Sequence, residues 1–215
     1  MGNMTSTILL GASHFATLAG LLTVPFILMQ VVRRRWNLVR LAGDYLFLFY
    51  VLCVIALVFF PLPTLVESAK LSGYDIQYVP FRFVSDIIRE TPFVWNRTST
   101  YIPALTNRAV LQVVYNILMF VPFGIYMRYM HHCSGKRILL LSFIVSLFIE
   151  LAQLTGLFFL FSGSYRLCDV DDLLLNTLGG VIGYRIVRRM EKHILPIEAF
   201  DRKAGRRARG LSFHF

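Results

Sequence analysis

Five long apolar stretches constrain this chain more than any other feature of its sequence. They cover residues 8–32, 43–63, 109–130, 138–161 and 170–187. A helix needs about 20 mostly apolar residues to cross the hydrocarbon core of a bilayer. Only 16% of the 215 residues are charged, whereas a soluble domain carries about 25%. We therefore predict an all-α, polytopic membrane helix bundle with about five transmembrane helices.

The basic residues are distributed unevenly between these stretches, and their distribution predicts the orientation. Sixteen of the 22 lysines and arginines follow the first, third and fifth stretches, and the other six follow the second and fourth. Loops on the cytoplasmic side of a membrane protein are enriched in Lys and Arg. The N-terminus is therefore predicted outside and the C-terminus inside. We interpret the formal net charge of +10 through this excess of basic residues on the cytoplasmic side.

This topology predicts four parts of the chain. They are two N-terminal transmembrane helices (1–63), an extracytoplasmic segment (64–108), a three-helix core (109–190) and a basic cytoplasmic tail (191–215). In the outer segment, Phe83, Ile87 and Ile88 have helix-like spacing, which fits an interfacial helix or, equally well, a loop packed on the helix ends.

The tail sequence "RKAGRRARG" would attract anionic lipid headgroups, although a topology anchor is the simpler interpretation. Nucleic-acid binding is not expected, because nothing in the chain supplies a folded reading surface.

Polar side chains occur inside three of the predicted spans, at a similar depth. With a rise of 1.5 Å per residue, Asn116, Glu150, Gln153, Asp172 and Asn176 all lie toward the outer ends of their spans. Since neighbouring spans run in opposite directions, a random scatter would not produce one level. A carboxylate at a helix centre costs about 2.5–3.5 kcal/mol. Glu150 is therefore expected either to be protonated or to have an internal partner, for which Arg82, Arg166 and the nearby amides are candidates.

The start of the fifth span carries an inward-facing stripe. Asp169, Asp172, Asn176 and the glycines from Gly179 to Gly183 recur every three or four residues. Small residues at this spacing let another helix approach closely, so we expect a neighbouring helix to bring Glu150 to this stripe. Asp171, which lies off the stripe, is expected to stay in contact with water.

This polar level has two interpretations, which the residues leave open. One is a pocket, open to the outside, that binds a headgroup, a cation or a diphosphate; the other is a hydrogen-bonded cluster that fixes helix register. Glu150, Asp169 and Asp172 are candidate oxygen ligands for a divalent cation such as Mg²⁺ or Ca²⁺, and Glu150 is a candidate for acid–base work. No nucleophile–base pair is visible, and the five histidines lie elsewhere.

Four blocks of this sequence resemble the VanZ-like family. They are "QYVPF" (77–81), "NILMFVPFG" (116–124), "IELAQ" (149–153) and "RLCDVDDLLLNTLGGVIGY" (166–184). These are small bacterial membrane proteins named after an accessory teicoplanin-resistance protein, and Gln77 stands where the family usually has Asn. The resemblance implies a multi-pass protein of the bacterial plasma membrane. It places the family's polar positions on Asn116, Glu150, Gln153, Arg166, Asp169, Asp172 and Asn176.

Three functional hypotheses follow. The first is an envelope protein that lowers susceptibility to teicoplanin-type glycopeptides, through an outward-facing pocket that these residues form with Arg82. Its ligand would be a lipid or a lipid-linked wall component. The second is an intramembrane enzyme, metal-assisted or not, that acts on a lipid headgroup or a diphosphate carrier. The third is a scaffold in which the polar residues only hold helices together.

Overall fold

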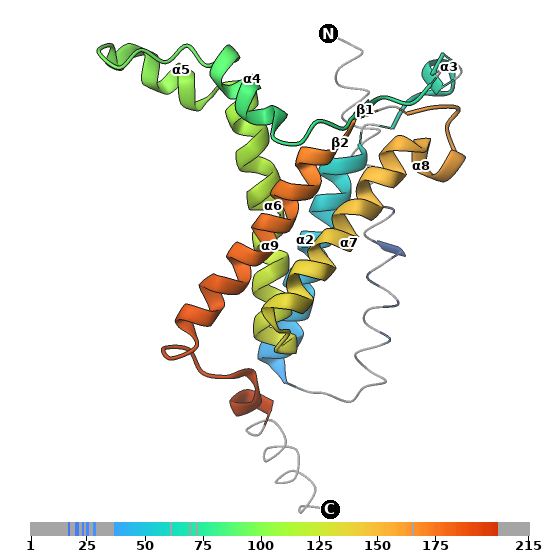
Figure 1. Ribbon diagram of the computed structural model, residues 1–215. Helices are drawn as coiled ribbons and strands as arrows, with labels where there is room; N and C mark the ends of the chain where they lie inside the picture. Colours follow the sequence, from blue (N-terminus) through green and yellow to red (C-terminus); the bar gives the residue numbers. More distant parts are fainter. Residues whose placement is uncertain are drawn as a thin grey trace, which may run out of the picture. The chain divides into compact units, whose positions relative to one another are not determined.

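The computed structural model describes residues 37–60, 62–68, 70–71, 73–164 and 166–201, and isolated positions between 17 and 28 (Figure 1). The long helices are α2 (Leu38–Phe59), α6 (Arg108–His131), α7 (Gly135–Leu154) and α9 (Val170–Met190). The short elements are α3 (Leu65–Ser68), β1 (Ile76–Gln77), α4 (Arg82–Glu90), η1 (Thr98–Thr100), α5 (Tyr101–Leu105), α8 (Gly156–Phe159) and β2 (Cys168–Asp169). The predicted all-α fold class is confirmed.

Three helices in the described part of the chain, α2, α6 and α7, are long and apolar enough to cross a membrane. Helix α9 is as long as these, but acidic residues in its first turn and Arg188 and Arg189 in its last turn leave it outside this set. The first predicted span, 8–32, lies outside the described residues apart from isolated positions.

The fourth span ends earlier than the apolar pattern predicts. Helix α7 ends at Leu154 rather than at residue 161, because the backbone leaves the right-handed helical region there. Gly156, Leu157, Phe158 and Phe159 have φ values of 60°, 55°, 57° and 69°, and L-residues in a right-handed helix cannot adopt them. The apolar run continues through this turn. Hydropathy depends only on the types of side chain and carries no information about the backbone conformation.

The chain divides into two compact units, and the first contains α2. This unit comprises Met1–Leu62, Tyr129–His132 and Val187–Phe215. Asn37 caps α2, accepting the Val39 N–H at 3.0 Å, and its amide donates to Asp201 Oδ1 at 2.6 Å. Arg40 forms a salt bridge with Asp201 at 2.9 Å. Polar contacts between segments far apart in the sequence therefore hold the described part of this unit together.

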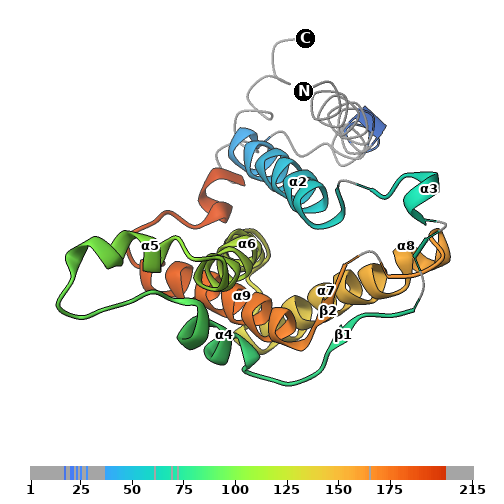
Figure 2. The same cartoon turned by 90° about the horizontal axis from the view of Figure 1, so that it is seen from above.

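The second unit, Pro63–Arg128 and Cys133–Ile186, is built on the contacts of α9 with α6 and α7 (Figure 2). A Cβ added at Gly179 would lie 2.2 Å from the Ile117 carbonyl oxygen of α6, and one at Gly183 would lie 2.2 Å from the Val121 oxygen. A Cβ at Gly180 would lie 2.0 Å from Ser142 Oγ of α7. The glycines thus allow the close helix packing that we expected. However, the helix that carries Glu150 meets the stripe at Gly180, whereas Gly179 and Gly183 face α6.

Candidate functional site

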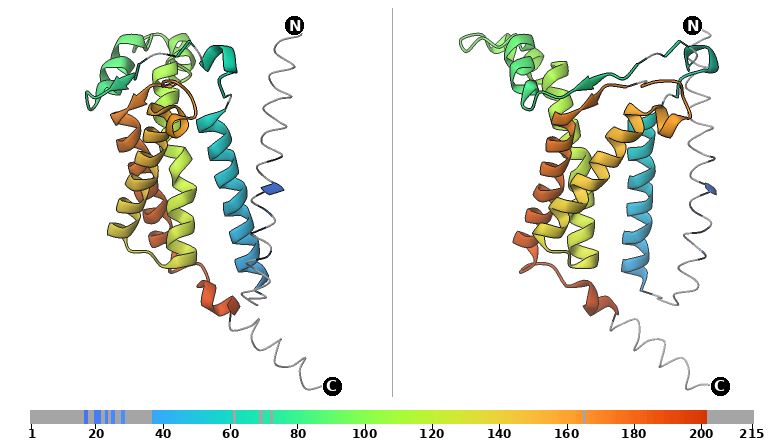
Figure 3. Two further views of the ribbon diagram at one scale, coloured as in Figure 1. Left: turned by 90° about the vertical axis from the view of Figure 1, so that its right-hand side faces the viewer. Right: turned by 45° about the vertical axis from the view of Figure 1, so that its right-hand side comes forward.

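A short parallel strand pair brings the segment of residues 64–108 to the start of α9 (Figure 3). In this pair, Ile76 lies opposite Cys168 and Gln77 lies opposite Asp169. The Gln77 side chain is fixed by its own loop, because its Nε2 donates to the Val79 carbonyl at 2.7 Å and its Oε1 accepts the Val79 N–H at 2.6 Å. The same Nε2 donates to Asp169 Oδ1 at 3.2 Å. Gln77 therefore joins the predicted polar level.

Asp169 links this strand pair to helix α7. Its side chain is buried, and its Oδ1 also accepts the Asp171 N–H at 2.8 Å. Burial raises the pKa of the Asp169 carboxyl, against the lowering effect of that backbone N–H. The backbone N–H of Asp169 donates to Glu150 Oε2 at 2.9 Å. The Glu150 carboxylate is thus connected to the Asp169 carboxylate through the backbone N–H of Asp169.

Glu150 is only 2% exposed, and its carboxylate accepts this backbone N–H and a hydrogen bond from the Cys168 thiol. Its predicted cationic partners, Arg82 and Arg166, both have exposed side chains. The Cys168 thiol lies beside Glu150, and its pKa is raised to about 11, mainly by burial. A thiol with so high a pKa stays protonated at neutral pH and is a poor nucleophile.

Asp171 is buried, so the expectation that it stays in contact with water is wrong. It is 3% exposed. Its Oδ1 accepts the Phe81 N–H at 2.6 Å and its Oδ2 accepts the Phe83 N–H at 2.9 Å. Helix α4 has no side-chain cap at its own N-cap position, and a carboxylate is the favoured group at a helix N-terminus. Asp171 supplies that cap from 90 residues away.

One signal in the sequence pointed to this role. The apolar pair Pro80–Phe81 immediately before α4 offers no Ser, Thr, Asp or Asn to cap the helix. A cap from another segment was therefore needed.

The carboxylate and amide side chains described here form one polar cluster. Its most accessible part lies on α6 and α9. Asn116 Nδ2 donates to Asp172 Oδ1, and Gln112, one turn earlier on α6, also bonds to the Asp172 side chain. Asn116 and Asp172 are half-buried and Gln112 is exposed. We call these three residues the exposed edge of the cluster.

Below the carboxylates, α7 and α9 are joined by polar side chains. Asn176, 1% exposed, donates from Nδ2 to Ser146 Oγ at 2.9 Å, while its Oδ1 and the Oγ of buried Ser142 have no hydrogen-bond partner among the described residues. Ser142 and Ser146 were missed at the sequence level. They precede Glu150 by eight and four residues, a helical spacing that would have revealed them.

Gln153, the last of the predicted residues, is buried at the end of α7. Its backbone carbonyl accepts Ser164 Oγ at 3.4 Å, and the same hydroxyl donates to the Arg166 carbonyl. Gln153 therefore supports the loop that leads into β2.

The metal assignment stays a prediction. In the part of the chain that the structure describes, no group of three or more His, Cys, Asp or Glu side chains is arranged to hold a metal ion. The oxygens of Glu150, Asp169 and Asp171 point to N–H donors instead. The geometry is that of a hydrogen-bonded carboxylate and amide cluster.

Comparison with known proteins identifies the family. The family model described as VanZ/LLP1 matches residues 47–191, which include the polar cluster, both strands and α4. The chain belongs to the VanZ/LLP1 family. The resemblance seen in the sequence blocks is thus confirmed, and with the three apolar helices it supports a membrane protein. Neither the curated proteins nor the solved structures contain a match.

Proposed function

We propose that this VanZ/LLP1 protein is a multi-pass protein of the bacterial plasma membrane that binds a lipid or a lipid-linked cell-wall precursor at an outward-facing polar site. Through this binding it lowers susceptibility to teicoplanin-type glycopeptides. The observation that carries the proposal is the convergence of carboxylates and amides from α6, α7, α9 and β1 on one end of the bundle.

The cluster separates into an inner layer and the exposed edge. In the inner layer, Glu150, Asp169 and Asp171 hold the backbone of the loop and of α4. Asp172, Asn116 and Gln112 form the edge that a ligand can reach. We assign ligand contact to this edge and a positioning role to the inner layer.

The groups at this edge suit a lipid headgroup. An amide and a carboxylate hydrogen-bond to hydroxyl or ammonium groups, and Arg82 is exposed and close enough to affect the Asp169 carboxylate. A guanidinium binds phosphate oxygens through charge-assisted hydrogen bonds. Teicoplanin is itself lipid-anchored, so a protein that occupies or redistributes wall-precursor lipids would alter where the antibiotic gathers.

The test compares Asp172→Asn with Glu191→Gln, a charge-removing control in the turn after α9. Asn at position 172 keeps an oxygen that accepts from Asn116 but removes the charge. We expect Asp172→Asn to insert normally, to lose co-purified lipid in native mass spectrometry and to lose any protection against teicoplanin. The control should retain both. If both variants match the parent protein in lipid content and susceptibility, the proposal fails.

The same purified protein tests the enzyme hypothesis. Incubation with a lipid diphosphate in liposomes, with and without Mg²⁺, should leave the lipid unchanged if the protein only binds it. Conversion of the lipid that is lost in Glu150→Gln would replace the binding proposal with the enzyme.

A further inference from the structure

Helix α4 has separate apolar and polar sides. At 3.6 residues per turn, the apolar residues fall on one side and the polar residues on the other. The apolar side has Phe83, Val84, Ile87 and Ile88, and the polar side has Arg82, Ser85, Asp86, Arg89 and Glu90. Such a division is typical of a helix that lies at a boundary between an apolar and an aqueous phase.

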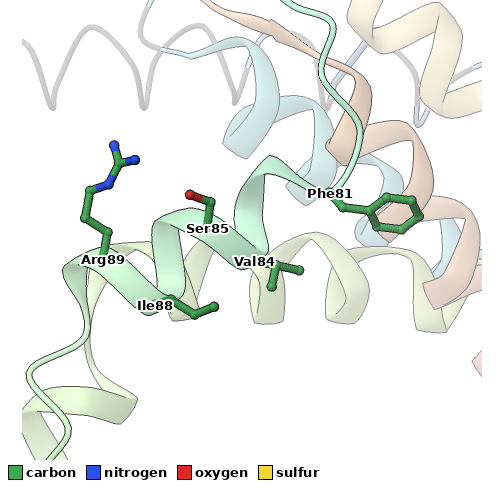
Figure 4. Close-up of a pocket in the computed structure, with 5 residues that line it drawn as sticks. All are labelled: Phe81, Val84, Ser85, Ile88 and Arg89. Carbon is green, nitrogen blue, oxygen red and sulfur yellow. The ribbon is translucent and has the colours of Figure 1, made fainter.

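Only half of the apolar side is covered by protein. Phe83 and Ile87 are partly buried, whereas Val84 is 44% and Ile88 76% exposed. A hollow of about 630 Å³ lies along this uncovered half, lined by Phe81, Val84, Ser85, Ile88 and Arg89. Figure 4 shows Val84 and Ile88 pointing to one side of the helix and Ser85 and Arg89 to the other. The hollow therefore runs along the border between apolar and polar side chains.

The segment that follows α4 carries an exposed aromatic group. Phe93 stacks on Tyr101 with 5.4 Å between ring centroids and meets Trp95 edge-on at 6.2 Å. Trp95 is 79% exposed, and Ile102 and Leu105 of α5 are exposed to a similar extent. Trp and Tyr are enriched where membrane proteins meet the lipid headgroups, and an exposed apolar surface of this kind marks an interaction site.

We propose that residues 81–105 form a lipid-contacting surface in the headgroup region of the outer leaflet, with the uncovered side of α4 and the aromatic group around Trp95 facing the acyl chains. This assignment does not depend on what binds at Asp172. The proposed partner is the bilayer itself, and the apolar side chains of this surface take no part in the hydrogen-bonded cluster.

Two further observations favour lipid as the partner. The segment runs directly into α6 at Arg108, and α6 is one of the helices able to cross the membrane. It also carries basic residues beside its apolar ones: Arg82, Arg89 and Arg97 against Asp86 and Glu90. Arginines next to exposed apolar side chains complement phosphate headgroups above acyl chains.

Asp171 connects this surface to the bundle. Its carboxylate holds the Phe81 and Phe83 N–H groups, so the first turn of α4 is attached to the beginning of α9. Phe81, whose φ is 64°, turns the chain into the helix at this point. The orientation of α4 against the bilayer is therefore set by a residue of the polar cluster.

The test uses the tryptophan content of the whole chain. The sequence has two tryptophans, Trp36 and Trp95, so Trp36→Phe leaves Trp95 as the single reporter. The full chain is reconstituted in phosphatidylcholine–phosphatidylglycerol vesicles containing lipids brominated at a shallow or a deep acyl position. We expect shallow bromine to quench most of the Trp95 emission, deep bromine to quench less, and aqueous acrylamide to have little access.

A matched pair of variants tests the orientation of α4. In a background without either natural tryptophan, Ile88→Trp places the reporter on the uncovered apolar side and Asp86→Trp places it on the polar side of the same helix. Brominated lipid should quench the first strongly and the second weakly.

Three results would overturn the proposal. Trp95 quenched by acrylamide but by neither brominated lipid would place the surface in water. Protection from all three quenchers would mean that protein covers it. Equal lipid quenching of Ile88→Trp and Asp86→Trp would exclude an oriented helix.

Discussion

Acidic side chains gather in two regions of this protein, and they are neutralised in different ways. In the unit with α2, Asp201 pairs with Arg40 at 2.9 Å and Glu198 pairs with His132 at 2.6 Å. In the other unit, the hydrogen-bond partners of Glu150, Asp169, Asp171 and Asp172 are backbone N–H groups, side-chain amides and the Cys168 thiol.

The difference in the partners of the carboxylates is our reason to propose a structural role for the first region and a functional role for the second. Ion pairs such as Arg40–Asp201 join chain segments and need no further partner. Carboxylates that are held by uncharged donors have no cation in direct contact, and their ionised form is costly in a buried place. Such an arrangement is expected where a ligand supplies the missing charge or hydrogen bonds. The comparison therefore supports the proposal that the second region binds the ligand.

The largest expected effect compares Asp171→Ala with Asp201→Ala. Loss of Asp171 leaves two part-buried N–H groups at the N-terminus of α4, those of Phe81 and Phe83, without this acceptor, at a cost of about 2 kcal/mol in unfolding free energy. Loss of Asp201, whose side chain is 37% exposed, should cost about 1 kcal/mol or less. Denaturant unfolding in detergent measures both, and hydrogen exchange at the Phe81 and Phe83 amides should accelerate only in Asp171→Ala. Equal losses would remove the distinction between the two regions.

A second prediction asks whether the polar contacts below the carboxylates are structural. Ser146→Ala removes the partner of Asn176 Nδ2 and should cost about 1 kcal/mol, since a buried amide is left unsatisfied. Replacing both residues, as Ser146→Ala with Asn176→Leu, should recover most of that stability. If the double variant also loses lipid binding, Asn176 serves the site as well as the fold. Additive losses would contradict this pairing.

The third prediction concerns charge removal without loss of a hydrogen bond. Glu150→Gln keeps an oxygen for the Asp169 N–H and removes a buried charge. The melting temperature should therefore stay the same or rise, with a gain of about 1 kcal/mol at most in unfolding free energy. Glu198→Gln loses attraction to His132 and should melt slightly earlier. A large destabilisation by Glu150→Gln would show that a cation compensates this charge.

The smallest expected effect is a pH dependence of stability to which Asp169 and Glu198 contribute with opposite signs. The pKa of Asp169 is raised, mainly by burial, so the folded state binds this proton more tightly than the unfolded state does. Its contribution should increase stability as the pH falls through its folded-state pKa. The pKa of Glu198 is lowered by its own backbone N–H and by His132. Its contribution is present above its unfolded-state pKa and is lost as the pH falls through the folded-state value.

Thermal melts of Asp169→Asn and Glu198→Gln across the acidic range check these signs. Each variant should remove one of the two opposite slopes from the profile of the parent protein. If both variants change the profile in the same direction, the assignment of at least one carboxyl is wrong.

The common depth of the polar groups stays a prediction from the sequence, and their pairing could not be predicted from it. Asn116, Glu150, Asp172 and Asn176 were placed at one depth from helix rise and span direction alone. The structure joins Asn116 to Asp172 but joins Asn176 to Ser146. Which side chains meet depends on helix rotation and close packing, here through Gly179 and Gly180, and hydropathy carries no information about either.

Two features show where local patterns fail. The apolar run of residues 138–161 predicted a longer helix, but four consecutive residues with positive φ end α7 at Leu154. Asp171 was expected to stay wet because it lies off the inward stripe of α9. It is buried because the N-terminus of α4, 90 residues away, requires an acceptor.

The sequence by itself determined the helical membrane class and the family. These follow from long apolar stretches and from backbone groups that a helix satisfies within one segment. Only the tertiary structure decided the partners of Glu150 and Asp169, the capping of α4 by Asp171 and the uncovered side of α4. Each of these depends on contacts between residues distant in the chain, and such contacts leave no periodic pattern in the sequence.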